Sequence, residues 1–242
     1  MRVIYIFLFV MVSNNTLGQV AKPDCKSFLK EYVNSMRKIS KIESNQVYKM
    51  KYNMSYEFRD NNTPNQSVDA TLIMSLSKSF YYSNVLNLFA DKNNGFMVMP
   101  LQRQIIWGPG NKGSTELDKM NTLLSFQDTL IEVSSVESCK LNVIQGDSIL
   151  QISLLIPKSI QEPTGIDKLV LKYSYKRKMM ESVVCQYVSN KELKRVTVTY
   201  YELDFDYEGN FNETAYQKVF KSKGKLREEY RGFEVIDNRD IN

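Results

Sequence analysis

Residues 47–58 read VYKMKYNMSYEF and alternate between apolar and polar side chains. The large apolar positions are Tyr48, Met50, Tyr52, Met54, Tyr56 and Phe58. Because successive side chains of a β-strand point to opposite sides of the sheet, this two-residue period predicts one long strand with one apolar and one polar face. The apolar face can belong to a protein core or to the wall of a cavity, and the pattern leaves both interpretations open.

The same alternation predicts a second strand after the turn-rich segment RDNNTPNQS, with apolar residues at Val68, Ala70, Leu72, Met74 and Leu76. These two strands would form a long antiparallel hairpin. Further strand patterns occur in SFYYSN, VLNLFA, FMVMP, RQIIWG, SCKLNVI, ILQISLLIP, IDKLVLKYSY, MESVVCQYVS and KRVTVTYYELDF. The final segment, KVFKSKGKLREEYRGFEVIDNR, predicts one or two closing strands.

Two segments show the three- and four-residue spacing of an amphipathic helix instead. They are PDCKSFLKEYVNSMRKISKI, near the N-terminus, and STELDKMNTLLSFQDTLIEV, in the middle of the chain. We therefore expect a mainly β fold with helices (α+β): a single strongly curved antiparallel sheet, or incomplete barrel, with an N-terminal helix and an inserted helix. The inserted helix would lie across the sheet as a lid through Leu117, Met120 and Leu124.

The first residues have the pattern of a cleaved secretory signal. Arg2 precedes the apolar run VIYIFLFVMV, and the polar segment SNNTLG follows, with small residues at Thr16 and Gly18. The run is shorter than the ~20 residues that cross a bilayer. We expect residues 1–18 to be removed, residues 19–242 to form one domain, and the protein to be exported.

Three cysteines allow at most one disulfide within the chain. Cys139 and Cys185 both lie in strand-like segments, so their pairing is the expectation, and three unpaired thiols are the alternative. The formal net charge of +5 is scattered along the chain, which gives no reason to expect a nucleic-acid partner. Contact with an anionic membrane surface stays open.

The chain contains no histidine, which removes the commonest general base and the usual nucleophile systems. Among the acidic residues, Glu202, Asp204 and Asp206 would share one strand face, spaced for a two-carboxylate or calcium site. Tyr201, Leu203 and Phe205 would then be buried on the opposite face, and the favoured interpretation of the acidic residues is a solvated surface. We expect no catalytic residue, no cofactor and no metal.

The apolar face of the first two strands carries Tyr and Met where a plain core would carry Val, Ile and Leu. Tyr can place a hydroxyl in a wet cavity mouth, and Met adapts its shape to irregular ligands. Long strands can also curl into a trough that only two helical segments are available to fill. The expected ligand-binding residues of this apolar trough are Tyr48, Met50, Tyr52, Met54, Tyr56, Phe58, Leu72, Met74 and Leu76.

The order of these parts, and the segment NLFADKNNGFMVMPLQRQIIW in particular, resembles the periplasmic lipoprotein-carrier (LolA-like) family. The counterparts of its strand, turn and second strand are Leu88 to Ala90, Asp91 to Gly95, and Phe96 to Trp107. The resemblance implies an incomplete barrel lined by apolar side chains, closed by helices, that carries lipoprotein acyl chains across the periplasm. The arginine that holds the family's lid cannot be assigned to Arg59 or Arg103. The longer C-terminal end favours a divergent lipid-binding relative.

The leading hypothesis is a non-enzymatic exported carrier or binding protein for acylated lipids or lipoproteins, periplasmic and monomeric. The second is a secreted or periplasmic protein-interaction module with a filled core, acting through loops such as RDNNTPNQS and GPGNKGS. The third is a carboxylate-based hydrolase using Glu202 and Asp204.

Overall fold

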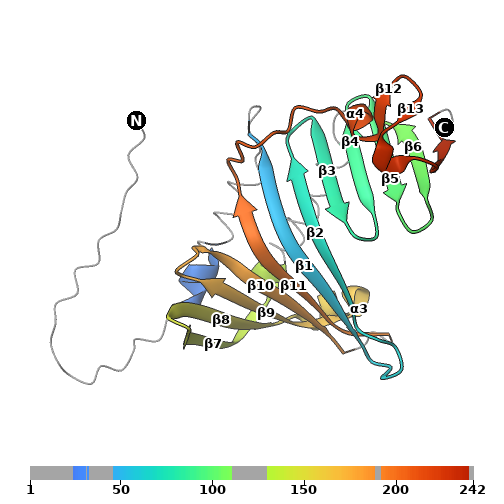
Figure 1. Cartoon of the computed structure of the whole chain (residues 1–242). Coiled ribbons are helices and arrows are strands. Elements are labelled where there is room, and N and C mark those ends of the chain that lie inside the picture. Colours follow the sequence, from blue (N-terminus) through green and yellow to red (C-terminus); the bar gives the residue numbers. More distant parts are fainter. Residues whose placement is uncertain (1–23, 31, 33–45, 111–129, 189–191, 240–242) are drawn as a thin grey trace, which may run out of the picture.

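The computed structural model describes residues 24–30, 32, 46–110, 130–188 and 192–239. Most of these residues belong to one open, curved 12-stranded sheet (Figure 1). From one edge to the other the strands are β14 (Glu234–Asp237), β6 (Gln104–Pro109), β5 (Asn94–Met99), β4 (Asn87–Asp91), β3 (Lys78–Ser83), β2 (Gln66–Met74), β1 (Tyr48–Phe58), β11 (Leu193–Asp204), β10 (Met179–Tyr187), β9 (Ile166–Ser174), β8 (Asp147–Leu155) and β7 (Ser135–Ile144). Neighbouring strands are antiparallel, except that β14 runs parallel to β6. The expected curved antiparallel sheet is confirmed.

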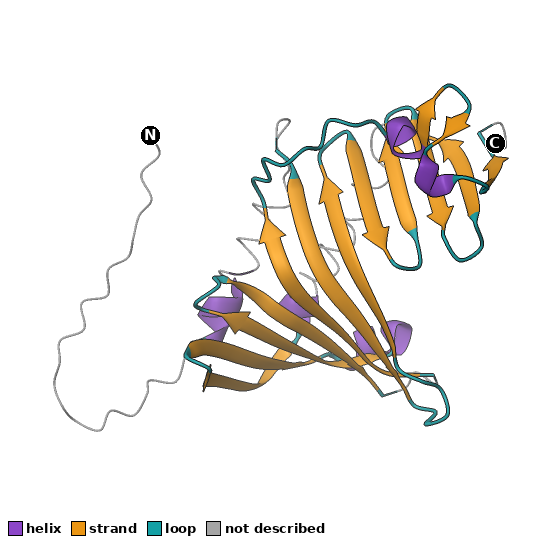
Figure 2. Cartoon of the chain, in the orientation of Figure 1, coloured by secondary structure: helices purple, strands orange, loops and turns teal. Residues whose placement is uncertain are grey.

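Short elements accompany the sheet (Figure 2). They are α3 (Lys158–Thr164), α4 (Ala215–Val219), the 3₁₀ helix η1 (Glu228–Tyr230) and a small pair of strands, β12 (Phe220–Ser222) and β13 (Lys225–Leu226). Residues 25–30 and 130–133 are also helical. Within the described part of the chain, no helix is long and apolar enough to cross a membrane. The expected signal segment, residues 1–18, lies outside the described residues.

The first of two large cores covers one end of the sheet. It contains Leu150, Ile152 and Leu154 of β8 and Leu169 and Leu171 of β9, all at most 2% exposed. Cys25 and Leu29, from the helical residues near the N-terminus, pack against this sheet face. The apolar side chains of this helical segment thus cover β-strands.

The second core lies at the other end of the sheet, on its opposite face. Paired aromatic residues of neighbouring strands form its wall, because Phe80 lies opposite Phe89, Phe89 opposite Phe96, and Phe96 opposite Trp107. The segment that follows β11 packs on this wall through Phe211, Ala215, Val219, Phe220 and Tyr230. The segment after β11 is therefore an integral part of this core.

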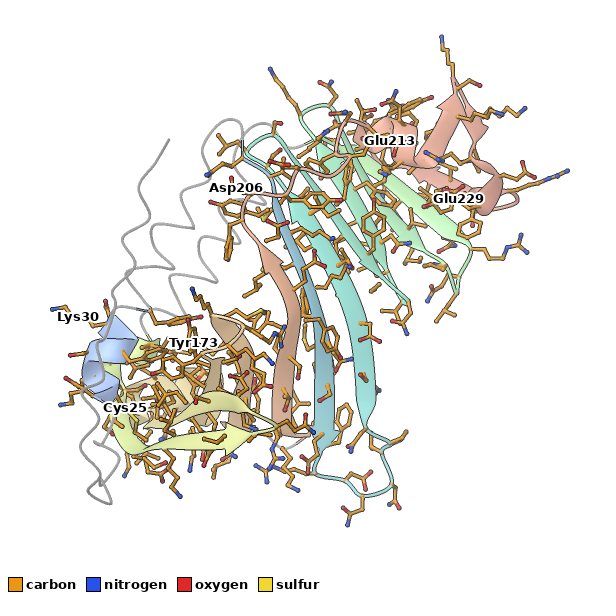
Figure 3. The ribbon with its side chains drawn as sticks, turned by 60° about the vertical axis from the view of Figure 1, so that its left-hand side comes forward. Cys25, Lys30, Tyr173, Asp206, Glu213 and Glu229 are labelled. Atoms are coloured by element: carbon orange, nitrogen blue, oxygen red, sulfur yellow. A yellow bond between two sulfur atoms is a disulfide. The ribbon has the colours of Figure 1, made fainter. Side chains whose placement is uncertain are left out.

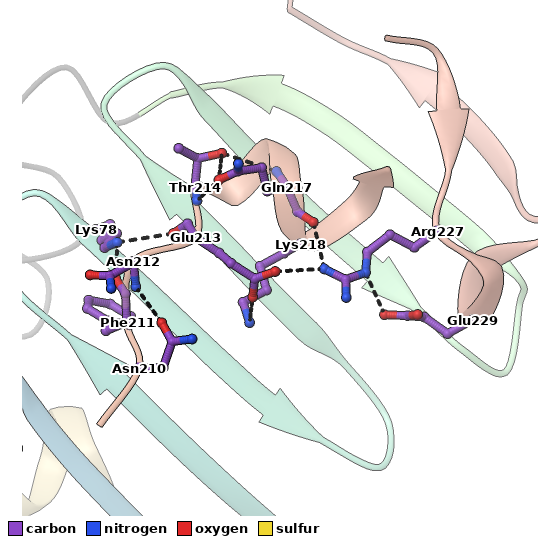
Figure 4. A network of polar contacts seen from close by, with 10 residues as sticks. All are labelled: Lys78, Asn210, Phe211, Asn212, Glu213, Thr214, Gln217, Lys218, Arg227 and Glu229. Atoms are coloured by element: carbon purple, nitrogen blue, oxygen red, sulfur yellow. Dashed lines mark hydrogen bonds and ion pairs between the residues drawn. The ribbon is translucent and has the colours of Figure 1, made fainter. Parts of the chain in front are cut away.

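Polar contacts hold that C-terminal segment in place (Figure 4). Glu213 forms ion pairs with Lys218 at 2.5 Å and with Arg227 at 2.9 Å. Lys78 of β3 donates to the backbone carbonyls of Phe211 and Glu213. At the turn between β4 and β5, the buried carboxylate of Asp91 accepts a hydrogen bond from the backbone N–H of Ala215 at 2.7 Å.

A disulfide joins Cys25 to Cys139, with their Cα atoms 6.4 Å apart, and Cys185 is a free thiol. The expected Cys139–Cys185 pair is wrong, as is the alternative of three unpaired thiols. Strands β8 and β9 separate β7 from β10, which at about 4.8 Å per strand places these two cysteines about 14 Å apart. Disulfide-bonded Cα atoms lie within about 7 Å of each other. The bond ties the N-terminal helical residues to edge strand β7 at the end of the sheet where Cys25 and Tyr173 lie (Figure 3).

Candidate functional site

The three central strands join the two cores and present a continuous apolar surface. In the antiparallel register, Tyr52 of β1 lies opposite Ala70 of β2 and Tyr200 of β11, and Met54 lies opposite Val68 and Val198. Directly opposed residues share a sheet face. We define the apolar face by Met50, Tyr52, Met54, Tyr56 and Phe58 of β1, Val68 and Leu72 of β2, Tyr81 of β3, and Val196, Val198, Tyr200 and Leu203 of β11.

The side chains that define the apolar face are all partly exposed, whereas Ala70, on the same side of the sheet, is 5% exposed. The two cores contrast with it, since Phe80 is 1% exposed and Leu150 is 0% exposed. Further along the same side of the sheet, Leu88 is partly exposed and Met97 is 39% exposed. Among the described residues, the central strands thus carry an incompletely covered apolar surface between two well-packed ends.

The predicted trough residues lie in two different places in the structure, some on the apolar face and others in a buried cluster. Met50, Tyr52, Met54, Tyr56 and Phe58 lie together on the apolar face, as the alternation predicts. Tyr48, 5% exposed, and Met74, 3% exposed, instead form a small buried cluster with Leu72 and Phe205 at one end of the strands. Whether these residues bind a ligand stays a prediction.

Leu76 does not belong to the apolar face. Strand β2 ends at Met74, and the backbone N–H of Ser75 donates to the carbonyl of Lys78 at 2.9 Å, so Leu76 lies in a turn and is 44% exposed. The alternation continued by chance beyond the strand's end. The expected lid residues Leu117, Met120 and Leu124 lie outside the described residues.

A β-bulge determines which residues of β11 reach the apolar face. The register between β1 and β11 shifts between Lys51 and Tyr52, so Tyr201 is the extra residue between Tyr200 and Glu202. An extra residue reverses the alternation along the bulged strand. Tyr200 and Leu203 therefore share the apolar face, whereas Tyr201 is 56% exposed. The expectation that Tyr201 is buried beside Leu203 is wrong.

Three tyrosines from three strands meet on the apolar face, and only one of them was predicted from the sequence. The rings of Tyr52 and Tyr200 lie 6.3 Å apart, and Tyr81 of β3 lies on the same face, opposite Leu72. Burial raises the pKa of Tyr52 to about 12 and that of Tyr200 to about 12. Their hydroxyls are therefore uncharged at neutral pH. Finding Tyr200 from the sequence would have required the pairing of β1 with a strand about 150 residues away.

The charged residues of the central strands lie on the opposite, polar face. Lys49 and Lys51 form ion pairs with Glu202 at 2.7 Å and 2.9 Å. Glu57 pairs with Lys194 at 2.5 Å and Arg195 at 3.4 Å. This ladder of opposite charges confirms the predicted polar face of residues 48–58.

The candidate carboxylates Glu202 and Asp204 share the polar face and are engaged by neighbouring groups. Hydrogen bonds from Lys49 and Lys51 hold the pKa of Glu202 below its ordinary value, so this group is an ionised ion-pair partner. Asp204 accepts the backbone N–H of Asp206 at 3.0 Å, and Asp206 lies beyond the end of β11. Among the described residues, no group of three acidic or cysteine side chains is placed to hold a metal ion.

No protein-family model matches the chain, and no curated protein matches its sequence. One solved structure that it resembles is an uncharacterized conserved protein from Thermus thermophilus, with 9% identity, a TM-score of 0.43, and coverage of 86% of this chain and 98% of that one. Another is a putative outer membrane lipoprotein-sorting protein domain from Vibrio parahaemolyticus, with 10% identity, a TM-score of 0.28, and coverage of 76% and 96%.

A LolA superfamily protein from Nitrosomonas europaea is also similar, with 8% identity, a TM-score of 0.28, and coverage of 80% of this chain and 98% of that one. At such low identity the likeness says nothing of function, so the function proposed below rests on the residues of this chain.

Proposed function

We propose that the protein is a non-enzymatic exported carrier or binding protein for acylated lipids or lipoproteins, with an acyl chain lying along the apolar face. The observation that carries this proposal is the run of partly exposed Tyr and Met side chains on the central strands, between two ends that are packed. We further propose that the protein is a periplasmic monomer that exchanges its ligand at a membrane surface.

The length and chemistry of the apolar face suit one acyl chain. From Met50 to Phe58, eight residue steps of about 3.4 Å extend over about 27 Å. An acyl chain spans half of a bilayer's ~30 Å hydrocarbon core, so a chain fits along β1. Each methylene group removed from water contributes about 0.8 kcal/mol, which makes binding favourable without any catalytic group.

The test is the lipid content of the purified protein. Replacing Tyr52 and Met54 together by Asp places two charges where the acyl chain would lie, at a cost of several kcal/mol if they are buried. We expect this variant to lose the lipid that co-purifies with the wild type, measured by mass spectrometry of the organic extract.

The matched control replaces Thr197 and Thr199 together by Asp. These residues have the same two-residue spacing but lie on the polar face, opposite Ser55 and Asn53. The control should retain its lipid. Equal lipid content in the wild type and in a folded Tyr52→Asp, Met54→Asp variant would contradict the proposal.

An interaction module with a filled core is the second candidate, and the two packed ends are compatible with it. A partner protein or a second copy of the chain would then cover the apolar face. Light scattering of the lipid-free wild type separates these cases. A monomer with an accessible apolar face supports lipid binding, and a dimer that dissociates in the Tyr52→Asp, Met54→Asp variant supports the alternative.

A further inference from the structure

We infer that the tyrosine hydroxyls make the apolar face selective for lipids whose acyl chain is held in a neutral ester or amide, over ionised free fatty acids. This inference rests on the proposed function and specifies its ligand. The residues that would determine the selectivity are Tyr52, Tyr81 and Tyr200.

The position of the hydroxyls suggests where the polar group of the ligand lies. Tyr52 and Tyr200 are directly opposed on adjacent central strands, and Tyr81 lies on the same face of the sheet, on β3 opposite Leu72. Apolar side chains flank them along the strands, with Met54 and Val198 on one side and Met50 and Leu203 on the other. A ligand lying along β1 therefore meets hydrogen-bonding groups midway, with apolar surface in both directions.

The charge distribution favours an uncharged polar group at this point. The charged residues of β1, namely Lys49, Lys51 and Glu57, all occupy polar-face positions, where Glu202, Lys194 and Arg195 pair with them. A carboxylate on the apolar face would give up its hydration without gaining an ion-pair partner from these strands. An ester or amide carbonyl needs only a hydrogen bond from a hydroxyl, which a tyrosine supplies.

The hydroxyls remain donors over the whole physiological pH range. A phenol that ionised would repel a carbonyl oxygen, but tyrosine is already protonated at physiological pH, and burial raises the pKa of Tyr52 and of Tyr200 further, to about 12. Tyrosine also contributes ring surface beside the acyl chain, so one side chain supplies both the apolar contact and the hydrogen bond. A Phe in its place would supply the contact alone.

The experiment compares two ligands with the same acyl chain, oleate and monooleoylglycerol, titrated at pH 8 into delipidated full-length protein. We expect the wild type to bind monooleoylglycerol about tenfold more tightly than oleate, which corresponds to about 1.4 kcal/mol. The Tyr52→Phe, Tyr200→Phe variant keeps the rings and should lose most of this preference, chiefly through weaker binding of monooleoylglycerol.

A control variant, Tyr175→Phe with Tyr201→Phe, removes two hydroxyls from side chains that are 45% and 56% exposed, and should bind like the wild type. A dipalmitoylated lipopeptide is the third ligand, because its ester groups offer the same chemistry from a lipoprotein source. Hydroxyl-dependent binding of the lipopeptide assigns lipoproteins as ligands, and hydroxyl-dependent binding of monooleoylglycerol alone assigns glycerolipids.

If the Tyr52→Phe, Tyr200→Phe variant still preferred monooleoylglycerol to oleate, the inference about the hydroxyls would be overturned. The proposed lipid-binding function would be unaffected. Tighter binding of oleate than of monooleoylglycerol by the wild type would likewise overturn the inference. Binding of neither ligand to the wild type would refute the proposed function itself.

Discussion

The residues that characterise the site are tyrosines whose hydroxyls are held in a mostly apolar setting. The alternation of residues 48–58 identified Tyr52, because a two-residue period is visible within a single strand. It could not identify Tyr200, whose face depends on the bulge at Tyr201. Nor could it choose between Tyr81 and Tyr82 in SFYYSN, which point to opposite faces and only one of which contributes to the site.

The raised pKa values of these tyrosines make stability depend on alkaline pH. In the unfolded chain the phenols titrate near 10.0, and in the folded chain Tyr52 and Tyr200 titrate at about 12. Between these values the folded state binds more protons, so the contribution of these two tyrosines to the free energy of unfolding is fully present below pH 10 and is lost as the pH rises toward 12. We expect Tyr52→Phe, Tyr200→Phe to lose less stability than the wild type between pH 9 and pH 11, measured by urea unfolding.

The control for this measurement is again Tyr175→Phe with Tyr201→Phe, which should follow the wild-type pH dependence. If the Tyr52→Phe, Tyr200→Phe variant lost as much stability as the wild type, these hydroxyls would not be desolvated in the folded chain, and the description of the apolar face would be wrong at this point.

At the scale of elements, the strands were predictable and their partners were not. Two-residue alternation and a turn-rich separator predicted both strands of the β1–β2 hairpin. Amphipathic spacing predicted the helical residues near the N-terminus. The disulfide was missed because it depends on strand order. Two strand-borne cysteines can pair only across adjacent elements, and Cys139 lies on edge strand β7, beside the N-terminal helical residues and three strands from Cys185.

The Cys25–Cys139 bond is expected to contribute much of the stability of the β7 end of the sheet. It closes a loop of 114 residues, for which the chain-entropy estimate is about 4–5 kcal/mol. We expect Cys25→Ser to lower the free energy of unfolding by about this amount in urea, and the reduced wild type to match the variant.

Cys185→Ala is the comparison for that experiment, because it removes a partly buried thiol without breaking the bond. Its stability should still fall on reduction, whereas that of Cys25→Ser should not change. A wild type that is equally stable with and without reductant would show that the bond does not constrain the fold.

At the scale of the whole molecule, the sheet is packed at its two ends on opposite faces. One core lies with the N-terminal helical residues on β8 to β10, and the other lies with the C-terminal segment on β3 to β6. Alternation shows that each strand has an apolar face, but it does not show which faces become covered. That depends on the helices and on the C-terminal segment, whose contacts are long-range. The incomplete covering of the central strands is what makes them the candidate binding surface.

The central claim, that an acyl chain lies on the apolar face, is tested most directly by NMR of the methionine methyl groups. The wild type labelled at methionine methyls would be titrated with monooleoylglycerol, with resonances assigned by single Met→Leu substitutions. Met50 and Met54 lie on the apolar face, whereas Met180 is 2% exposed in the core beside β9. We predict that the signals of Met50 and Met54 shift on binding and that the signal of Met180 does not. Binding that leaves Met50 and Met54 unchanged would contradict the account.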